Sequence, residues 1–293
     1  MRDLTGRVVL MTGAAGGIGP RIVRALIKER THFVLAALPT PELDELVIEI
    51  RNAGLRAIAV PTDVTDRDQL ERLVQAAEAE FGRIDILMNN AGIETAASYH
   101  KLRPEQIERL IAVNFQAPMM LTHMVLPGML ERRTGHIVCM SSYVGRAAAA
   151  YLEPYCATKG GLIPFVSSLR ASYRGTGVSA SVIMPGVIRA GMAERWEAES
   201  GKRAPRLAGA TTAEAVARAV VTAIKRDKPE VLVTSVPSRI VTTLAEASPR
   251  FGEWVTRAIG ENRWLRTIAE RRDRELDQQA ASDDTKAPAG RHD

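Results

Sequence analysis

The N-terminal stretch restricts the fold more than any other part of this sequence. Arg7 to Met11 is a short apolar run of the kind that forms a buried parallel strand. The glycine-rich segment TGAAGGIG follows at residues 12–19, and an amphipathic stretch continues from Pro20 to about Arg30. Proline suits the first turn of a helix, where no backbone N–H is needed. The chain is therefore predicted to begin with a strand, a glycine-rich turn and a helix.

A turn of this kind is suited to a dinucleotide. Glycines let the backbone approach a pyrophosphate, and the helix N-terminus offers N–H groups and the positive end of its dipole. The end of the second strand then distinguishes the cofactors, because an acidic residue favours NAD and a nearby arginine favours NADP. That strand is expected at His32 to Ala37 and is followed by Leu38 and Pro39, which carry neither signal. The sequence thus predicts NAD or NADP without choosing between them.

Apolar strand-like runs alternate with helical stretches along most of the chain. Such alternation predicts a parallel sheet that helices cover on both faces. We therefore expect a doubly wound, Rossmann-like α/β domain with seven strands over residues 1–236. One long helix is expected from about Pro104 to Leu130, and residues 187–211 have the composition of a mobile loop or lid. The expected strands are residues 7–11, 32–37, 55–61, 84–88, 135–140, 178–184 and 230–234.

Composition and cysteine usage narrow the functional classes. The formal net charge is +5 for 293 residues, with lysine and arginine spread along the chain, so we expect no nucleic-acid binding. Cys139 and Cys156 lack metal-ligand spacing, so we predict no metal site and two buried thiols in a reducing cytosol. The N-terminal apolar run is too short for a signal peptide, and we expect no membrane-spanning segment. The expected localisation is cytoplasmic, with membrane-peripheral as the alternative that the C-terminal region leaves open.

The segment from Ser141 to Gly161 contains three side chains that can act together on a carbonyl or an alcohol. Tyr155 and Lys159 are four residues apart, so they share one face if this alanine-rich run is helical. Tyrosine has an ordinary pKa of about 10, and a neighbouring ammonium favours the phenolate. Ser142 ends an apolar run and can hold a carbonyl oxygen while Tyr155 exchanges a proton with it. The alternative is a solvated Tyr–Lys pair, which is common on helices.

Two asparagine positions have both a structural and a functional interpretation. The segment from Asn89 to Gly92 follows the fourth strand and suits a tight polar turn, which is either only a turn or part of the cofactor site. Asn114 lies among apolar residues, where a buried amide must find hydrogen-bond partners. It is either a satisfied core amide or a polar group on a proton path.

In their order and spacing these motifs resemble those of the short-chain dehydrogenases/reductases, over about residues 5–235. The resemblance implies an NAD(P)-dependent oxidoreductase that interconverts an alcohol and a ketone or aldehyde. It also implies a homo-oligomer, either a dimer or a tetramer. The segments that carry it are TGAAGGIG at 12–19, Asp63-Val64, NNAG at 89–92, Asn114, Ser142, YCATK at 155–159 and Pro185-Gly186.

The roles that the resemblance implies divide between catalysis and cofactor binding. Tyr155 would be the general acid and base, and Ser142 would bind the substrate oxygen. Lys159 would bind the nicotinamide ribose and lower the pKa of the tyrosine, and Asn114 would hold a water that links Lys159 to solvent. The implied cofactor-binding residues are Gly13, Gly17, Ile18, Gly19, Asp63, Val64, Asn90, Ala91, Gly92, Tyr155, Lys159, Pro185, Gly186 and Ile188.

The sequence departs from the family pattern at three places. Ala37 and Leu38 carry no charge that would select one cofactor. Gly16 stands where NADP-dependent members often have a basic residue. Ala190 stands where a threonine commonly follows the Pro-Gly pair, so one hydrogen bond to the nicotinamide carboxamide is in question.

The residues after the last expected strand form a C-terminal extension. Apolar residues recur at helical spacing from Ile240 to Ile259 and again from Trp264 to Ile268, with a break at Ser248-Pro249. We predict amphipathic helices over residues 237–278 and a disordered tail over residues 279–293. The helices can contact a membrane surface, bind a partner subunit, form a flap over the substrate pocket or pack on their own domain.

The leading hypothesis from the sequence is an oxidoreductase that acts on a small molecule. The apolar surface of the extension suggests an apolar substrate such as a steroid, a retinoid or a fatty-acyl-like molecule. The alternative is a non-catalytic dinucleotide-binding protein with a regulatory or scaffold role, although every catalytic position is present in the sequence.

Overall fold

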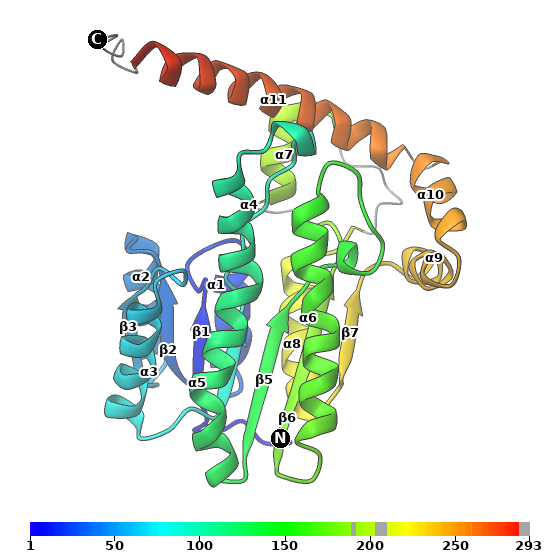
Figure 1. Cartoon of the computed structure of the whole chain (residues 1–293). Helices are drawn as coiled ribbons and strands as arrows, with labels where there is room; N and C mark the ends of the chain where they lie inside the picture. The colour runs from blue at the N-terminus through cyan, green and yellow to red at the C-terminus, as the bar shows by residue number, and fades with distance from the viewer. Residues whose placement is uncertain (189–191, 203–209, 259, 287–293) are drawn as a thin grey trace.

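The computed structural model of the chain describes residues 1–188, 192–202, 210–258 and 260–286. Its centre is a seven-stranded parallel sheet with helices on both faces, which confirms the predicted fold class (Figure 1). The strand order is β3-β2-β1-β4-β5-β6-β7, so β1 pairs with both β2 and β4 and the winding reverses there. The strands are β1 (Val8–Thr12), β2 (His32–Ala37), β3 (Ala57–Pro61), β4 (Ile86–Asn89), β5 (Gly135–Met140), β6 (Val178–Pro185) and β7 (Glu230–Val233).

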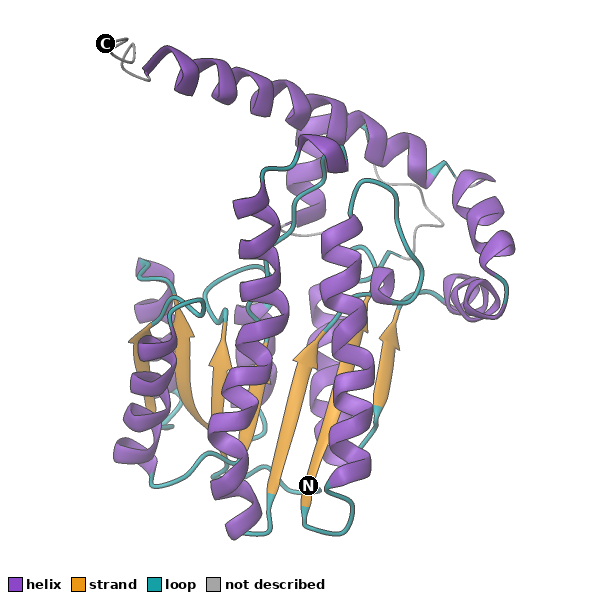
Figure 2. Cartoon of the chain, in the orientation of Figure 1, coloured by secondary structure: helices purple, strands orange, loops and turns teal. Residues whose placement is uncertain are grey.

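The apolar strands are buried because each face of the sheet packs against its own set of helices (Figure 2). Alternate residues of β1 enter the two cores: Val9 and Met11 face one, and Val8 and Leu10 face the other. The first core is closed by α1 (Gly19–Ile27), α2 (Pro41–Asn52) and α8 (Ala213–Arg226), and the second by α3 (Arg67–Phe81), α5 (Ala117–Glu131) and α6 (Glu153–Ser172). This arrangement leaves the loops at the carboxyl ends of the strands to build a ligand site.

The expected helix from Pro104 to Leu130 changes its winding in the middle. Here α4 (Pro104–Ile111) passes into a π-helical segment, Ala112–Gln116, which contains Asn114 and leads into α5. By length and composition the 28-residue stretch Pro104–Glu131 is apolar enough to cross a membrane, contrary to our expectation that no segment is. Half of its most apolar window is buried inside the molecule, as in a core helix, so this match is weak evidence for a span.

The segment between β6 and α8 contains a helix that the sequence did not predict. This helix, α7 (Met192–Ser200), lies where a loop or lid was expected, and it packs against the C-terminal helix α11 (Glu261–Lys286). The buried Trp196 of α7 stacks edge-on against Trp264 of α11, with ring centres 5.6 Å apart. Tertiary contact, rather than its own weak periodicity, stabilises α7. Ala190 and residues 203–209 lie outside the described residues.

The C-terminal extension forms three helices, α9 (Val236–Ala247), α10 (Pro249–Ala258) and α11. In Figure 1, α11 passes above the carboxyl ends of the strands, beside α7. It remains helical through Lys286, whereas the sequence analysis expected disorder from Gln279. The first helix-breaking residue after Glu261 is Pro288, so nothing in the sequence stops the helix at residue 279. Residues 287–293 lie outside the described part of the chain.

Candidate active site

The glycine-rich turn after β1 forms a cradle that excludes side chains. Gly13 has a φ of +63°, and a Cβ atom there would lie 2.8 Å from Ala91 Cα. Gly17 also has a positive φ, +52°. A Cβ atom on Gly19, the first residue of α1, would lie 2.3 Å from Ala14 O. Glycine is therefore required for the backbone conformation or for close packing at these positions.

The turn after β4 is bonded directly to the glycine cradle. Asn90 Nδ2 donates to Thr12 O at 3.2 Å and to Gly13 O at 2.9 Å. Thr12 Oγ1 in return accepts from the backbone N of Asn90 and of Ala91, both at 3.2 Å. Asn90 is thus more than a turn residue, because it holds the two loops at the point where the strand order reverses. Its Oδ1 is buried and accepts no hydrogen bond from the described residues.

Ser142, Tyr155 and Lys159 meet at one wall of a single cavity. Ser142 follows β5, whereas Tyr155 and Lys159 lie one turn apart on α6, as the four-residue spacing predicts. The Ser142 hydroxyl hydrogen-bonds the Tyr155 phenol. Lys159 Nζ lies 5.8 Å from the centre of the Tyr155 ring and donates to Met140 O at 2.9 Å. The alternative of a solvated Tyr–Lys pair is excluded, since both side chains are buried.

Burial determines the proton affinity of both groups. Loss of water raises the pKa of Tyr155 above its ordinary value, while the hydrogen bond from Ser142 lowers it and the charge of Glu94 raises it further. Burial also lowers the pKa of Lys159 to about 8. The phenol is therefore protonated at neutral pH and can donate to a carbonyl oxygen. The lowering of the tyrosine pKa by Lys159 remains a prediction.

Asn114 is a satisfied buried amide. The π-helical segment directs it at the backbone of Ile93, where its Oδ1 accepts from Ile93 N at 2.9 Å and its Nδ2 donates to Ile93 O at 2.8 Å. A Cβ atom on Gly92 would lie 3.1 Å from Lys159 Nζ and 3.3 Å from Asn114 Oδ1. Asn114 therefore positions the loop beneath Lys159, and the proton path that the resemblance implies remains a prediction.

The cavity has a volume of about 1050 Å³ and joins the glycine cradle to the Tyr155 wall. Most of the expected site residues line it: Gly13, Gly17, Ile18, Asn90, Ala91, Gly92, Ser142, Tyr155, Lys159, Pro185, Gly186 and Ile188. The remaining four, Gly19, Asp63, Val64 and Asn114, are not among its lining residues. Gly19 shapes the cradle from behind, Asp63 accepts from Thr65 N at 2.9 Å, and Val64 packs against the core.

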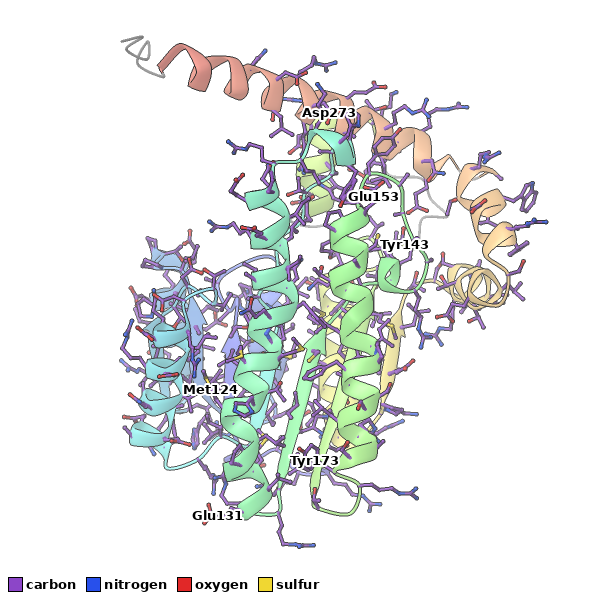
Figure 3. All side chains as sticks on the ribbon, in the orientation of Figure 1. Met124, Glu131, Tyr143, Glu153, Tyr173 and Asp273 are labelled. Carbon is purple, nitrogen blue, oxygen red and sulfur yellow. The ribbon has the colours of Figure 1, made fainter. Side chains whose placement is uncertain are left out.

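Sequence reasoning missed the wall of the cavity that lies opposite the cradle. This wall comes from the loop after β4 and from α7 and α11, through Glu94, Trp196, Glu199, Glu261, Trp264, Leu265 and Arg272. Tyr143, which is labelled in Figure 3, also lines the cavity, and it hydrogen-bonds the buried Glu261 carboxylate. The helical spacing of Trp264, Leu265 and Ile268 indicated a buried face, but nothing in the sequence indicated what that face covers. In the structure α11 packs on its own domain and also lines the cavity, which supports two of the four alternatives for the extension: packing on its own domain and a flap.

The donor set fits a dinucleotide better than a metal ion. The cradle presents bare backbone and the N-terminus of α1, which suit a pyrophosphate. Among the described residues there is no group of three or more His, Cys, Asp or Glu side chains that could hold a metal ion.

The chain is similar to known proteins that are named as dehydrogenases, reductases or oxidoreductases. The profile described as short chain dehydrogenase matches residues 7–201. The chain is 37% identical over 266 residues to the Ketoacyl reductase HetN of Nostoc sp., which covers 89% of this chain and 91% of that protein. It is 32% identical over 273 residues to human Dehydrogenase/reductase SDR family member 7, which covers 89% of this chain and 80% of that protein.

A solved structure and the extent of these alignments add two findings. A metagenomic short-chain oxidoreductase, crystallised in complex with NADP, matches with a TM-score of 0.67 and 30% identity, over 78% of this chain and 97% of that one. The alignments to the two proteins above cover more of this chain than residues 1–236 contain. The similarity therefore continues into the C-terminal helices.

Proposed function

Because the chain belongs to the short-chain dehydrogenase/reductase family and is an NAD(P)-dependent oxidoreductase, we propose that it interconverts an alcohol and a ketone or aldehyde, with Tyr155 as the general acid and base. The observation that carries the proposal is the meeting of Ser142, Tyr155 and Lys159 on one wall of the cavity that also contains the glycine cradle. A tyrosine and a lysine four residues apart occur on many helices, so the spacing alone does not identify an active site. The burial of both side chains at this cavity distinguishes them from an ordinary exposed pair.

The chain's own residues hold the substrate and move the proton. In the reductive direction Tyr155 donates its phenolic proton to the carbonyl oxygen, and Ser142 supplies a second hydrogen bond to that oxygen. The nicotinamide cofactor supplies the hydride when it is bound. In the oxidative direction Tyr155 acts as the phenolate, which the Lys159 ammonium favours, and it becomes the neutral phenol when it accepts the proton of the alcohol.

We assign the cofactor-binding residues by their place around the cavity. Gly13, Gly17 and Ile18 would face the pyrophosphate, and Gly19, behind them, is the first residue of α1. Asn90, Ala91 and Gly92 lie beside the cradle, while Pro185, Gly186 and Ile188 close the nicotinamide end. Asp63 and Val64 lie after β3, next to the end of β2, and we assign them as contacts of the adenine.

An apolar substrate fits the far wall of the cavity. Trp196, Trp264, Leu265, Leu152 and Val144 are apolar residues that line the cavity. The name of the HetN relative, a ketoacyl reductase, supports a substrate with an extended chain beside the reacting carbonyl. Glu94, Glu261 and Arg272 add charged groups at the same wall, so the pocket can also recognise a polar substituent.

We propose that NADP is accepted at least as well as NAD. The end of β2 carries Ala37 and Leu38 and no carboxylate that would repel a 2′-phosphate. The structural neighbour was solved with NADP. Titration of the purified protein with NADH and with NADPH, followed by nicotinamide fluorescence, distinguishes the two. A clear preference for NADH would contradict this assignment.

Replacement of the phenol tests the mechanism. Tyr155→Phe should lower turnover by about a thousandfold, because a positioned acid or base contributes roughly 10²–10⁴-fold. Binding of NADPH should stay within a few-fold of wild type, because the ring and the glycine cradle remain. Tyr173→Phe, at the far end of α6, is the matched control and should keep full turnover. Retention of turnover in Tyr155→Phe would reject the proposal.

A further inference from the structure

We propose that Arg272 is a positioning residue of the active site. Through Glu94 it holds the loop after β4, and through Glu199 it holds helix α7, next to the wall that carries Tyr155. The inference rests on the proposed function. It concerns a residue beyond the part of the chain that matches the family profile, residues 7–201.

One guanidinium joins three elements at the edge of the cavity. Arg272 of α11 binds both oxygens of Glu94, with Nη1–Oε2 at 3.1 Å and Nη2–Oε1 at 3.3 Å. It also binds both oxygens of Glu199 on α7, with Nε–Oε2 at 3.1 Å and Nη2–Oε1 at 3.3 Å. Trp196 Nε1 of α7 donates to Glu94 Oε1 at 3.0 Å. The planar, five-donor shape of arginine makes such double pairing possible, and lysine cannot reproduce it.

Burial makes this cluster sensitive to the loss of its cation. The side chain of Glu94 is 4% exposed and that of Arg272 is 18% exposed. A buried carboxylate that loses its cationic partner keeps the cost of desolvation without the attraction that offset it. The loop that carries Glu94 would then move toward water.

That loop is the one on which Lys159 and Asn114 pack. Glu94 directly follows Ile93, whose backbone N and O both bond Asn114. Gly92, which precedes Ile93, passes close to the lysine, since a Cβ atom there would lie 3.1 Å from Lys159 Nζ. A displacement of Glu94 is therefore transmitted within two residues to the contacts that position the catalytic lysine.

The charge of Glu94 also acts on the catalytic phenol. The groups that face Glu94 are Arg272 from α11, Glu199 from α7 and Tyr155 from α6. Glu194 and the Tyr143–Glu261 pair line the same cavity, and none of these residues is substituted in the test described below. The carboxylate of Glu94 raises the pKa of Tyr155, and Arg272 supplies the charge that compensates it. Without Arg272 the phenol should be harder to deprotonate.

Other contacts fasten α11 independently of Arg272. Asp273 Oδ1 accepts from Ser98 N at 3.0 Å, Lys101 Nζ donates to Asp277 Oδ1 at 2.7 Å, and Arg266 Nε donates to Tyr151 Oη at 3.1 Å. These contacts should keep α11 in place when Arg272 is replaced, so the effect of the replacement is local.

The test compares Arg272→Gln with Arg274→Gln on the full chain. Arg274 is an exposed arginine two residues further along α11. The adjacent Arg271 is unsuitable as a control because its Nη1 donates to Glu199 O at 2.8 Å. Arg272→Gln should lower kcat/KM by roughly tenfold or more, because small misplacements of reacting groups have effects of that size. It should also move the pH midpoint of alcohol oxidation upward by roughly half a unit or more. NADPH affinity should not change.

Two further variants keep the inference falsifiable. Adding Glu94→Gln to Arg272→Gln should restore the pH midpoint, because it removes the uncompensated charge, whereas a purely structural role predicts no recovery. If Arg272→Gln does not fold, Arg272→Lys keeps the charge but not the fork and should show the loss in kcat/KM without the pH shift. Values for Arg272→Gln equal to those for Arg274→Gln would overturn the inference. Turnover by Tyr155→Phe would instead overturn the proposed function, so the two failures are distinguishable.

Discussion

Lys159 carries its charge at a place from which water is excluded. Its side chain is 3% exposed and donates to Met140 O at 2.9 Å. Burial lowers its pKa to about 8, whereas an unfolded lysine has a pKa of about 10.4. The unfolded chain therefore binds more protons between these two pH values, and the contribution of this group to stability rises with pH across that window. Below pH 8 the native state bears the full cost of the buried charge.

Lys159→Met should therefore stabilise the fold in a pH-dependent way. At pH 7 the free energy of unfolding should rise by up to about 3 kcal/mol, reduced by about 1 kcal/mol for the lost hydrogen bond. The gain should fade as the pH approaches 10.5. Urea denaturation at pH 7 and pH 10 measures both values. Lys28→Met, at an exposed position, should show no pH-dependent difference from wild type. An equal effect of Lys159→Met at both pH values would contradict the interpretation.

At the scale of elements, α7 and α11 form one wall of the cavity through two tryptophans. Trp196 and Trp264 meet edge to face, with ring planes at 64°. Trp264 is 5% exposed and its Nε1 donates to Lys202 O at 3.2 Å. An aromatic pair in this geometry adds stabilisation beyond the buried area, so the two helices hold each other in place.

Trp264→Ala should change kcat/KM for large substrates more than for small ones. Removing the indole takes away apolar surface that a long chain would contact, so we expect kcat/KM to fall for long-chain ketones while small ketones are nearly unaffected. The loss of a buried tryptophan should also cost about 3–5 kcal/mol of stability. Trp254→Ala on α10 is the control, because that side chain is 64% exposed. A chain-length series of ketones with each variant measures the difference, and identical profiles would argue against a substrate wall at Trp264.

At the scale of the whole molecule, the dinucleotide cradle and the substrate wall come from different parts of the chain. The cradle, six of the seven strands and the Tyr155 wall lie before residue 189, whereas the opposite wall depends on α11. Deletion of residues 259–293 should therefore leave NADPH binding within a few-fold of wild type and abolish turnover of apolar ketones. Fluorescence titration and turnover on the same preparation measure both. Turnover that survives the deletion would show that α11 is dispensable.

The extension also leaves apolar surface exposed. Val236, Ile240 and Leu244 follow one another at helical spacing on α9, and Trp254 projects from α10. A membrane surface or a second copy of the chain can cover such residues. Peripheral membrane binding and a dimeric or tetrameric state thus remain predictions, for which liposome co-sedimentation and light scattering are the direct measurements.

The sequence by itself determined the sheet, the glycine cradle and the proposed catalytic trio, Ser142, Tyr155 and Lys159. Strand and helix periodicities are local, and the glycines, Asn90, Ser142, Tyr155 and Lys159 each lie at the end or start of such an element, so their convergence follows from the parallel topology. A short helix such as α7 escaped prediction because its stability comes from α11 rather than from its own pattern.

Only the tertiary structure decided what covers the substrate and how the buried charges are compensated. The pair Glu94–Arg272 joins residues 178 positions apart, and neither residue belongs to a motif. No periodicity records such a contact, because it depends on the direction in which α11 returns over the sheet. The pKa values of Tyr155 and Lys159 also depend on the tertiary structure, because burial rather than spacing in the sequence shifts them.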